Sequence, residues 1–382
     1  MLQKKLLETI EELNASYISV WEDVCNLESP TADKAGVDAV GSYFVDLARQ
    51  RGWEVEVLEL ANAGNPVCIT INPSAEKEAV VFSGHIDTVH PVGLFGTPAV
   101  RKDDHKIYGP GVMDCKGGVV ASFMALDALD RCGFRDRPVK LIIQTDEETG
   151  SKTSGKKTVE FMMEKAKGAA AFLNTEGIDG TKAVLIRKGI LRYRLNVHGK
   201  AVHSARCVTG ANAIAEAAHK ILKLEELKDN AGLTCNCGVI SGGTVANTVA
   251  AECSFLADIR FVDPADCERA REIIRQVAAE NRIPGCTCDA EEVSHRPSMP
   301  LRQINEKLLE DMNRIYEENG LPRLTGGMSL SGSDAAYATE AGIPCVDNLG
   351  VDGGRIHSAE EFGLMSSLAE SAKRLALVAC CL

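Results

Sequence analysis

The spacing of apolar residues alternates between helical and strand-like intervals along the first half of the chain. The opening residues 1–16 carry leucine and isoleucine at helical spacing among Lys and Glu, which predicts an amphipathic helix. Further helices are expected over 35–51, 117–131 and 155–165, and strands over 53–60, 67–71, 79–82, 139–144 and 170–173. Alternation of this kind predicts an α/β domain with helices around a largely parallel sheet.

The middle of the chain has a different order of predicted helices and strands. Residues 190–197 alternate at period two, and 211–228 read as an amphipathic helix. Strands are expected at 234–240, 252–259 and 286–293, and Asp263-Pro264 supplies an N-cap and a first-turn proline for a helix reaching about residue 281. The order βαββαβ predicts a small α+β domain inserted at 188–295.

After the insertion the α/β pattern resumes. Helices are expected over 303–319, 334–341 and from 363 onward, with a strand at 344–348. We therefore expect one catalytic α/β domain formed by residues 1–187 and 296–382, which the 188–295 domain interrupts.

Net charge and hydropathy limit the partners and the cellular compartment that the sequence allows us to expect. The net charge is −12, and no basic stripe is visible, so nucleic acid is not expected as a partner. The N-terminal segment lacks the uninterrupted apolar run of a signal peptide, and no segment is apolar enough to cross a bilayer. The expectation is a cytoplasmic protein without membrane contact.

Several of the fourteen cysteines occur in close pairs, at 235/237, 286/288 and 380/381. None of these pairs has the two-residue gap of a zinc knuckle, and no export signal suggests a disulfide framework. The C-x-C pairs are therefore interpreted as apolar filling on one side of a strand.

Candidate chemistry begins directly after a predicted strand, where His85 and Asp87 lie two residues apart. In extended backbone both side chains point to one side, so Asp87 can orient the imidazole for a metal. Asp114 follows in the segment 109–118, which has four glycines and a proline, and Asp146-Glu147-Glu148 follows the buried strand 139–144. Taken singly, these features also fit surface polarity, a helix cap and a solvated acidic loop.

Glu176 ends a fourth strand-like segment, and His357 lies in a glycine-rich loop near the C-terminus. Five oxygen and nitrogen donors thus lie at the ends of separate elements, where α/β proteins gather their sites. Such a set fits a two-metal centre in which one carboxylate bridges the ions.

In these motifs the chain resembles the cocatalytic zinc exopeptidases and deacylases, which include glutamate carboxypeptidase, aminoacylase, acetylornithine deacetylase and peptidase T. The resembling segments occur in the family's order and cover nearly the whole chain: 83–89, 109–118, 146–150, 175–176, 199–204, 331–335 and 357–361. One departure is Gly177, where carboxypeptidase-like relatives often have proline.

The resemblance implies roles for individual residues. Asp114 would bridge two ions, and a cis peptide bond would follow it. The other ligands would be His85 and Glu176 for one ion, and Glu148 and His357 for the other. Glu147 would be the general base, and Asp87 would orient His85.

In the inserted domain, the resemblance implies that His203 reaches the active site of a neighbouring subunit and stabilises the oxyanion. This makes the domain a lid and the protein a homodimer. Asn247 would contact substrate, Arg296 would bind its carboxylate, and Gly332 would lie in the loop that lines the specificity pocket.

The expected function is that of a metal-dependent hydrolase of amide bonds, most simply a carboxypeptidase-type exopeptidase acting on small peptides. Two Zn²⁺ ions are expected, and Mn²⁺ or Co²⁺ can substitute in such a site. The alternatives are a deacylase of N-acyl or N-carbamoyl amino acids and a di- or tripeptidase. A non-catalytic binding protein is disfavoured because Glu147 and all five ligands are present.

Overall fold

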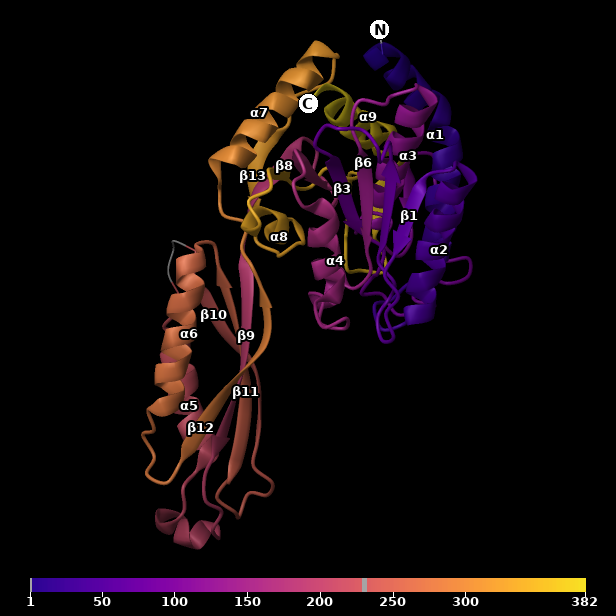
Figure 1. Cartoon of the computed structure of the whole chain (residues 1–382). Helices are drawn as coiled ribbons and strands as arrows, with labels where there is room; N and C mark the ends of the chain where they lie inside the picture. The colour runs from indigo at the N-terminus through magenta and orange to yellow at the C-terminus, as the bar shows by residue number, and fades with distance from the viewer. Residues whose placement is uncertain (1, 229–231) are drawn as a thin grey trace. The chain divides into compact units, whose positions relative to one another are not determined.

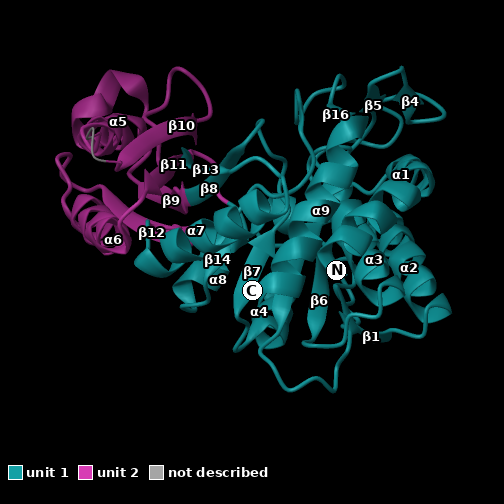
Figure 2. Ribbon diagram, turned by 90° about the horizontal axis from the view of Figure 1, so that it is seen from above, with its two compact units in different colours: residues 1–185, 301–328, 333–382 teal, residues 186–300, 329–332 magenta. Residues whose placement is uncertain are grey.

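The computed structural model of the chain describes residues 2–228 and 232–382. Met1, which the sequence places in the first helix, lies outside the described residues. The chain forms two compact units, which are coloured separately in Figure 2. Unit 1 comprises Met1–Leu185, Leu301–Met328 and Ser333–Leu382, and unit 2 comprises Ile186–Pro300 and Ser329–Gly332.

A six-stranded sheet forms the centre of unit 1 (Figure 1). Its strands are, in spatial order, β1 (Glu54–Val57), β2 (Val67–Ile71), β6 (Val139–Gln144), β3 (Val80–His85), β7 (Ala171–Asn174) and β14 (Cys345–Val346). The last four are mutually parallel, whereas β1 and β2 add an antiparallel edge. The largely parallel sheet predicted from the sequence is therefore confirmed.

Helices cover this sheet on both faces, because every residue of β2, β3 and β7 is buried. The helices of unit 1 are α1 (Leu2–Asn26), α2 (Lys34–Gln50), α3 (Lys116–Arg131), α4 (Lys157–Ala166), α7 (Gln303–Glu318), α8 (Ala335–Glu340) and α9 (Met365–Cys381). Of these, α3 packs against β3 and β6 and also against α1 and α9.

The first helix is longer than the sequence prediction, which ended it at Ser16. Its buried stripe continues through Tyr17, Trp21 and Val24, so the packing that stabilises the helix extends to Asn26. The Trp21 indole donates a hydrogen bond to the carbonyl of Val112, 3.0 Å away, in the loop that leads to Asp114.

Two small sheets were not predicted. One has the order β15 (Gly353–Gly354), β16 (Phe362–Leu364), β5 (Lys106–Tyr108) and β4 (Arg101–Lys102), and the other pairs β13 (Thr325–Ser329) with β8 (Lys182–Arg187). Strands of two or three residues carry no period, and β13 is rich in glycine and polar residues. The first of these sheets joins the segments that precede Asp114 and follow His357.

Unit 2 is the predicted βαββαβ arrangement. Its elements are β9 (Gly189–His198), α5 (Ala213–Glu225), β10 (Thr234–Gly242), β11 (Glu252–Phe261), α6 (Pro264–Ala279) and β12 (Thr287–Arg296). The four strands form an antiparallel sheet in the order β10-β11-β9-β12. Asp263 caps α6 by accepting a hydrogen bond from the amide of Ala265 at 2.8 Å, as the sequence predicts.

One face of this sheet packs against both helices, and burial alternates strictly along β9 and β11. The buried side chains of the strands, α5 and α6 form a single cluster. Cys235, Cys253 and Cys267 belong to this core, and Cys237 and Cys288 pack against it. These five thiols thus act as small apolar residues in or against the core, as the sequence suggested for the pairs 235/237 and 286/288 in part, whereas Cys207 is exposed.

Candidate metal centre

Three segments of the candidate site begin where parallel strands end. His85 is the last residue of β3, Glu147 and Glu148 lie in a 3₁₀ turn (Glu147–Thr149) just after β6, and Glu176 follows β7. Because β6, β3 and β7 are parallel neighbours, their carboxyl ends meet at one edge of the sheet. The topology therefore gathers residues that are far apart in the sequence.

Asp114 lies between the two histidines. Its Oδ1 is 3.0 Å from Nε2 of His85, and its Oδ2 is 3.2 Å from Nε2 of His357. One carboxylate oxygen thus faces each imidazole, which is the arrangement that a bridging ligand requires. The peptide bond from Asp114 to Cys115 is cis, as the resemblance implied.

The remaining two acids complete two half-sites around Asp114. Glu176 Oε1 is 3.7 Å from Nε2 of His85, and Glu148 Oε2 is 3.5 Å from Nε2 of His357. Donor atoms of His85, Asp114 and Glu148 all lie within 4.8 Å of one another. The ligand atoms of His85, Cys115 and Glu176 also lie within 4.8 Å of one another, and the buried Cys115 thiol donates a hydrogen bond to the carbonyl of Thr175 at 3.3 Å.

The acids and imidazoles of the cluster shift one another's pKa values. Burial raises the pKa of Glu148 to about 7, because the acid is taken out of water beside Asp114. Hydrogen bonds to Asp114 and Glu148 raise the pKa of His357 to about 10. For Asp114, the hydrogen bonds from the two histidines outweigh burial and lower the pKa. Two imidazoles among three carboxylates are a donor set that suits zinc.

Asp87 is fully buried and serves two parts of the site. His85 Nδ1 is 3.0 Å from the Asp87 carbonyl oxygen and 3.4 Å from its carboxylate, so both groups of Asp87 lie against the ring. The same carboxylate accepts hydrogen bonds from the amides of Glu147 and Glu148, at 3.1 and 3.2 Å. It also accepts one from the Thr31 hydroxyl at 2.8 Å, a contact that sequence reasoning missed.

Glycine permits two close approaches at this site. A Cβ at Gly118, in the first turn of α3, would be 1.9 Å from the carbonyl oxygen of Thr175, the residue before Glu176. A Cβ at Gly177 would come within 2.7 Å of the terminal methyl of Met113. The departure from proline at position 177 therefore fits this chain, in which Met113 occupies that space.

The predicted residues of unit 2 form two pairs within that unit. The exposed His203 forms a β-bridge with Thr248, and the amide of Ser204 donates to the carbonyl of Asn247 at 2.9 Å. The buried Arg296 side chain packs against Gly332, where a Cβ would be 2.9 Å from the arginine Cδ. These contacts place His203 beside Asn247 and Arg296 beside Gly332.

Sequence reasoning missed Arg187, which precedes β9 and holds the loop that contains Gly332. Its guanidinium donates to the hydroxyl of Ser331 at 3.0 Å, to that of Ser329 at 3.4 Å and to the carbonyl of Gly332 at 3.3 Å. Arg187 carries no motif, and its partners lie more than 140 positions away, so no local signal could have revealed it.

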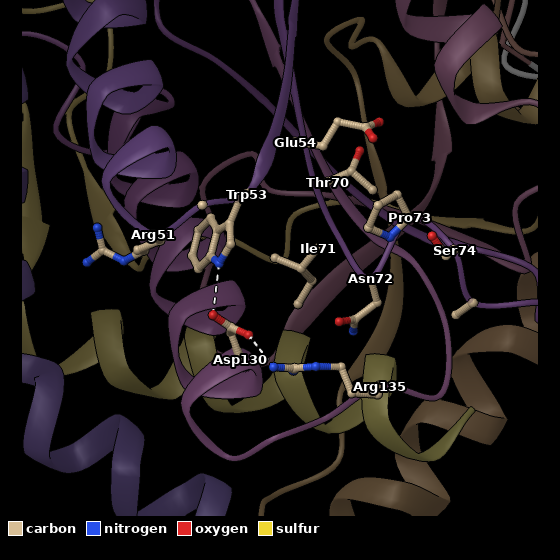
Figure 3. A pocket seen from close by; sticks show the side chains of 12 residues that line it. Arg51, Trp53, Glu54, Thr70, Ile71, Asn72, Pro73, Ser74, Asp130 and Arg135 are labelled. Atoms are coloured by element: carbon tan, nitrogen blue, oxygen red, sulfur yellow. Dashed lines mark hydrogen bonds and ion pairs between the residues drawn. The ribbon is translucent and has the colours of Figure 1, made fainter.

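A cavity of about 800 Å³ lies in unit 1 away from the metal centre (Figure 3). Trp53, Ile71 and Arg135 are among its lining residues, and Asp130 accepts a hydrogen bond from the Trp53 indole and forms an ion pair with Arg135. Ile71 pairs with Val139 at the start of β6, whereas the metal centre follows the end of β6. The cavity is therefore at the opposite edge of the sheet.

The fold and the acid–imidazole cluster together define a metal-dependent hydrolase acting on amide bonds. The profile of peptidase family M20/M25/M40 matches residues 81–380. The chain belongs to this family.

Similar proteins agree with this assignment. The chain is 29% identical over 364 residues to carboxypeptidase G2 of Pseudomonas sp. (strain RS-16), covering 92% of this chain and 86% of that protein. The fold is shared with aminopeptidase PepT from Bacillus cereus, with a TM-score of 0.77, 22% identity and coverage of 96% and 98% of the two chains. It is also shared with the M20 family metallo-carboxypeptidase Sso-CP2 from Sulfolobus solfataricus, with a TM-score of 0.74, 18% identity and coverage of 95% and 98%.

No helix within residues 2–228 and 232–382 combines the length and apolar character needed to span a membrane.

Proposed function

We propose that the protein is a carboxypeptidase-type exopeptidase that removes a C-terminal residue from small peptides by means of two zinc ions. The observation that carries this proposal is the position of Asp114, with one carboxylate oxygen against His85 and the other against His357. An aspartate so placed can serve two ions at once.

In this proposal the two half-sites become two coordination shells. His85, Glu176 and Asp114 would hold one ion, and His357, Glu148 and Asp114 would hold the other. When bound, the ions supply a water of lowered pKa and a polarised amide carbonyl. Zinc suits this donor set, and Mn²⁺ or Co²⁺ can replace it.

Glu147 is proposed as the general base. Its backbone is fixed by the hydrogen bond to Asp87, and its side chain is buried in the turn that also presents Glu148. Glu147 takes a proton from the attacking water, holds it on its carboxylate and gives it to the leaving nitrogen. The neighbouring acids thus divide the work, because Glu148 binds metal while Glu147 moves the proton.

The remaining roles are assigned to residues of unit 2. We propose that His203, supplied by a second copy of the chain, stabilises the oxyanion, and that Asn247 contacts the substrate. Arg296 binds the α-carboxylate of the C-terminal residue, with Gly332 and its loop beside it. This assignment requires a homodimer formed through unit 2, and the name of the relative carboxypeptidase G2 supports the carboxypeptidase reading.

A substrate panel tests the proposal. Zinc-loaded protein is assayed with C-terminal glutamyl peptides, the same peptides with an amidated C-terminus, N-acyl and N-carbamoyl amino acids, and di- and tripeptides. The expected result is hydrolysis of peptides with a free α-carboxylate, lost on amidation and lost in Glu147→Gln. Preferential turnover of N-acyl or N-carbamoyl amino acids would contradict the peptidase assignment and support a deacylase.

The dimeric part of the proposal has its own test. A mixture of Glu147→Gln and His203→Asn chains forms hybrid dimers in which one site has an intact base and receives His203 from the other chain. Activity in the mixture above that of either variant alone is expected. A mixture no more active than its components would contradict the assignment of His203 to a neighbouring subunit.

A further inference from the structure

The strongest unassigned feature of unit 1 is the buried carboxylate of Glu361, four residues after His357. Its Oε1 accepts hydrogen bonds from the amides of Met113 at 2.9 Å and Asp114 at 3.1 Å. Its Oε2 accepts one from the amide of Gly111 at 3.4 Å. One side chain therefore satisfies three backbone donors in the loop that carries Asp114.

A fourth partner links Glu361 to the strand that carries His85. His90, five residues beyond His85, is buried, and its Nε2 is 2.8 Å from Oε2 of Glu361. The His90 ring packs edge-on against Phe95, with centroids 5.0 Å apart. This packing and the hydrogen bond fix the imidazole in place.

Glu361 is thus the point at which three ligand-bearing segments meet: the end of β3 with His85, the loop with Asp114, and the C-terminal loop with His357. We propose that Glu361 is a positioning residue for the metal centre, which sets where the two oxygens of Asp114 lie. The inference rests on the proposed two-metal site and assigns Glu361 and its partner His90 a role in forming it.

The surroundings indicate why an acid is needed here. The loop that contains Asp114 lies between β5 and α3 and has no ladder of its own, so its buried amides need acceptors from elsewhere. A carboxylate can accept all of these bonds, whereas a glutamine would turn an NH₂ group toward one set of donors. The buried Lys116 amine donates to the carbonyls of Val24 and Leu27; burial lowers the pKa of this lysine, and the charge of Glu361 acts in the opposite direction.

Small displacements of Asp114 matter because each of its oxygens must face a different ion. Loss of an outer hydrogen-bond partner of a ligand typically costs about 10–100-fold in metal affinity. Glu361→Gln is therefore expected to weaken zinc binding by about 10–100-fold. It should also alter the visible absorption spectrum of the Co²⁺-loaded protein, which a purely structural role would leave unchanged.

Glu216 provides a matched control in unit 2. It is equally buried, and its Oε2 accepts hydrogen bonds from the amides of Arg282 at 2.9 Å and Ile283 at 2.7 Å. Glu216→Gln is expected to lower stability without changing zinc affinity or the Co²⁺ spectrum. Comparing the two variants separates the general effect of losing a buried carboxylate acceptor from the specific effect of losing Glu361.

The experiment measures zinc affinity by competition with a chromophoric chelator, together with the Co²⁺ spectrum, in wild type, Glu361→Gln and Glu216→Gln. If Glu361→Gln does not fold, the milder His90→Phe, which removes one donor to Glu361, is measured in its place. Weakened affinity in either variant, with Glu216→Gln unchanged, supports the inference. If the folded variant, Glu361→Gln or in its place His90→Phe, has the zinc affinity and Co²⁺ spectrum of the wild type, the role of Glu361 is overturned while the proposed two-metal site stands. If the wild type itself binds no metal, the proposed site is overturned as well.

Discussion

Each of the two units contains a histidine flanked by carboxylates, and His85 of unit 1 and His198 of unit 2 can be compared directly. In unit 1, the side chain of His85 is only 2% exposed and faces Asp87, Asp114 and Glu176. In unit 2, the side chain of His198 is 45% exposed, and its two nitrogens lie 2.7 Å from carboxylate oxygens of Glu252 and Asp289. The residue types are the same, but the surroundings differ.

The two clusters differ in the elements that supply their acids and in the exposure of the histidine to solvent. The acids around His198 stand on β11 and β12, on either side of β9, and one protonated imidazole satisfies both of them in contact with solvent. The acids around His85 come from separate loops at the buried edge of a parallel sheet and outnumber the positive charges that face them. A cluster of that kind gains far more from a divalent cation.

The largest expected effect on activity is that of replacing Glu147, the proposed general base. Glu147→Gln should lower kcat by about 10²–10⁴-fold, because the proton of the attacking water loses its acceptor. Zinc content per chain should stay at the wild-type value. Steady-state kinetics and metal analysis measure both, with Glu252→Gln from the exposed cluster as the control, for which kcat should not change.

The oxyanion role of His203 predicts a somewhat smaller loss. His203→Asn keeps a side-chain acceptor for the amide of Ala205, which the imidazole Nδ1 now accepts at 3.2 Å. With that local contact preserved, kcat is expected to fall by about 10²–10³-fold, the range found when a single oxyanion donor is removed. A kcat equal to that of the wild type, at full zinc occupancy, would contradict the role.

Metal removal should destabilise unit 1. Ions that bind only the folded chain stabilise it by about 2.7 kcal/mol per site when free metal is 100 times Kd. Urea unfolding with zinc and with a chelator should therefore give clearly separated midpoints. In Asp114→Asn the two midpoints should nearly coincide, and a large zinc effect that persisted in this variant would argue against binding at the cluster.

The smallest effect is expected at the exposed cluster. Hydrogen bonds to Asp289 and Glu252 raise the pKa of His198. The stabilisation is therefore fully present below the unfolded pKa near 6.5 and is lost as pH rises through the folded pKa. His198→Phe should cost about 0.2–1 kcal/mol near pH 6, as exposed ion pairs do. The cost should fade toward pH 9, which urea midpoints at both pH values measure; an equal cost at both would contradict the charge-based account.

The sequence predicted those parts of the molecule that local patterns encode. Strands such as β3 and β6 are rich in large apolar residues, and the helices of unit 2 have caps and amphipathic spacing, so their existence and order were confirmed. The short strands β4, β5, β15 and β16 were missed, because two or three residues have no period and form only through pairing between distant segments.

The same distinction holds for the site. The five candidate ligands were found because each lies in a short motif at the end of an element, and the structure brings all five together around Asp114. Glu361 and Thr31 were missed as partners, because their role consists of hydrogen bonds to segments that are about 250 and 56 positions away. Sequence spacing cannot reveal such contacts.

Asp114 is the residue through which one cluster is proposed to hold two ions. The most direct test is metal content per chain, measured by mass spectrometry after zinc loading and removal of free metal, for the wild type and for Asp114→Asn. Two zinc ions per wild-type chain are expected, and the rate of hydrolysis should rise as they bind. In Asp114→Asn, both the zinc content and the rate of hydrolysis should fall markedly. A wild type fully active with one ion, or an Asp114→Asn chain that still retains two, would contradict this proposal.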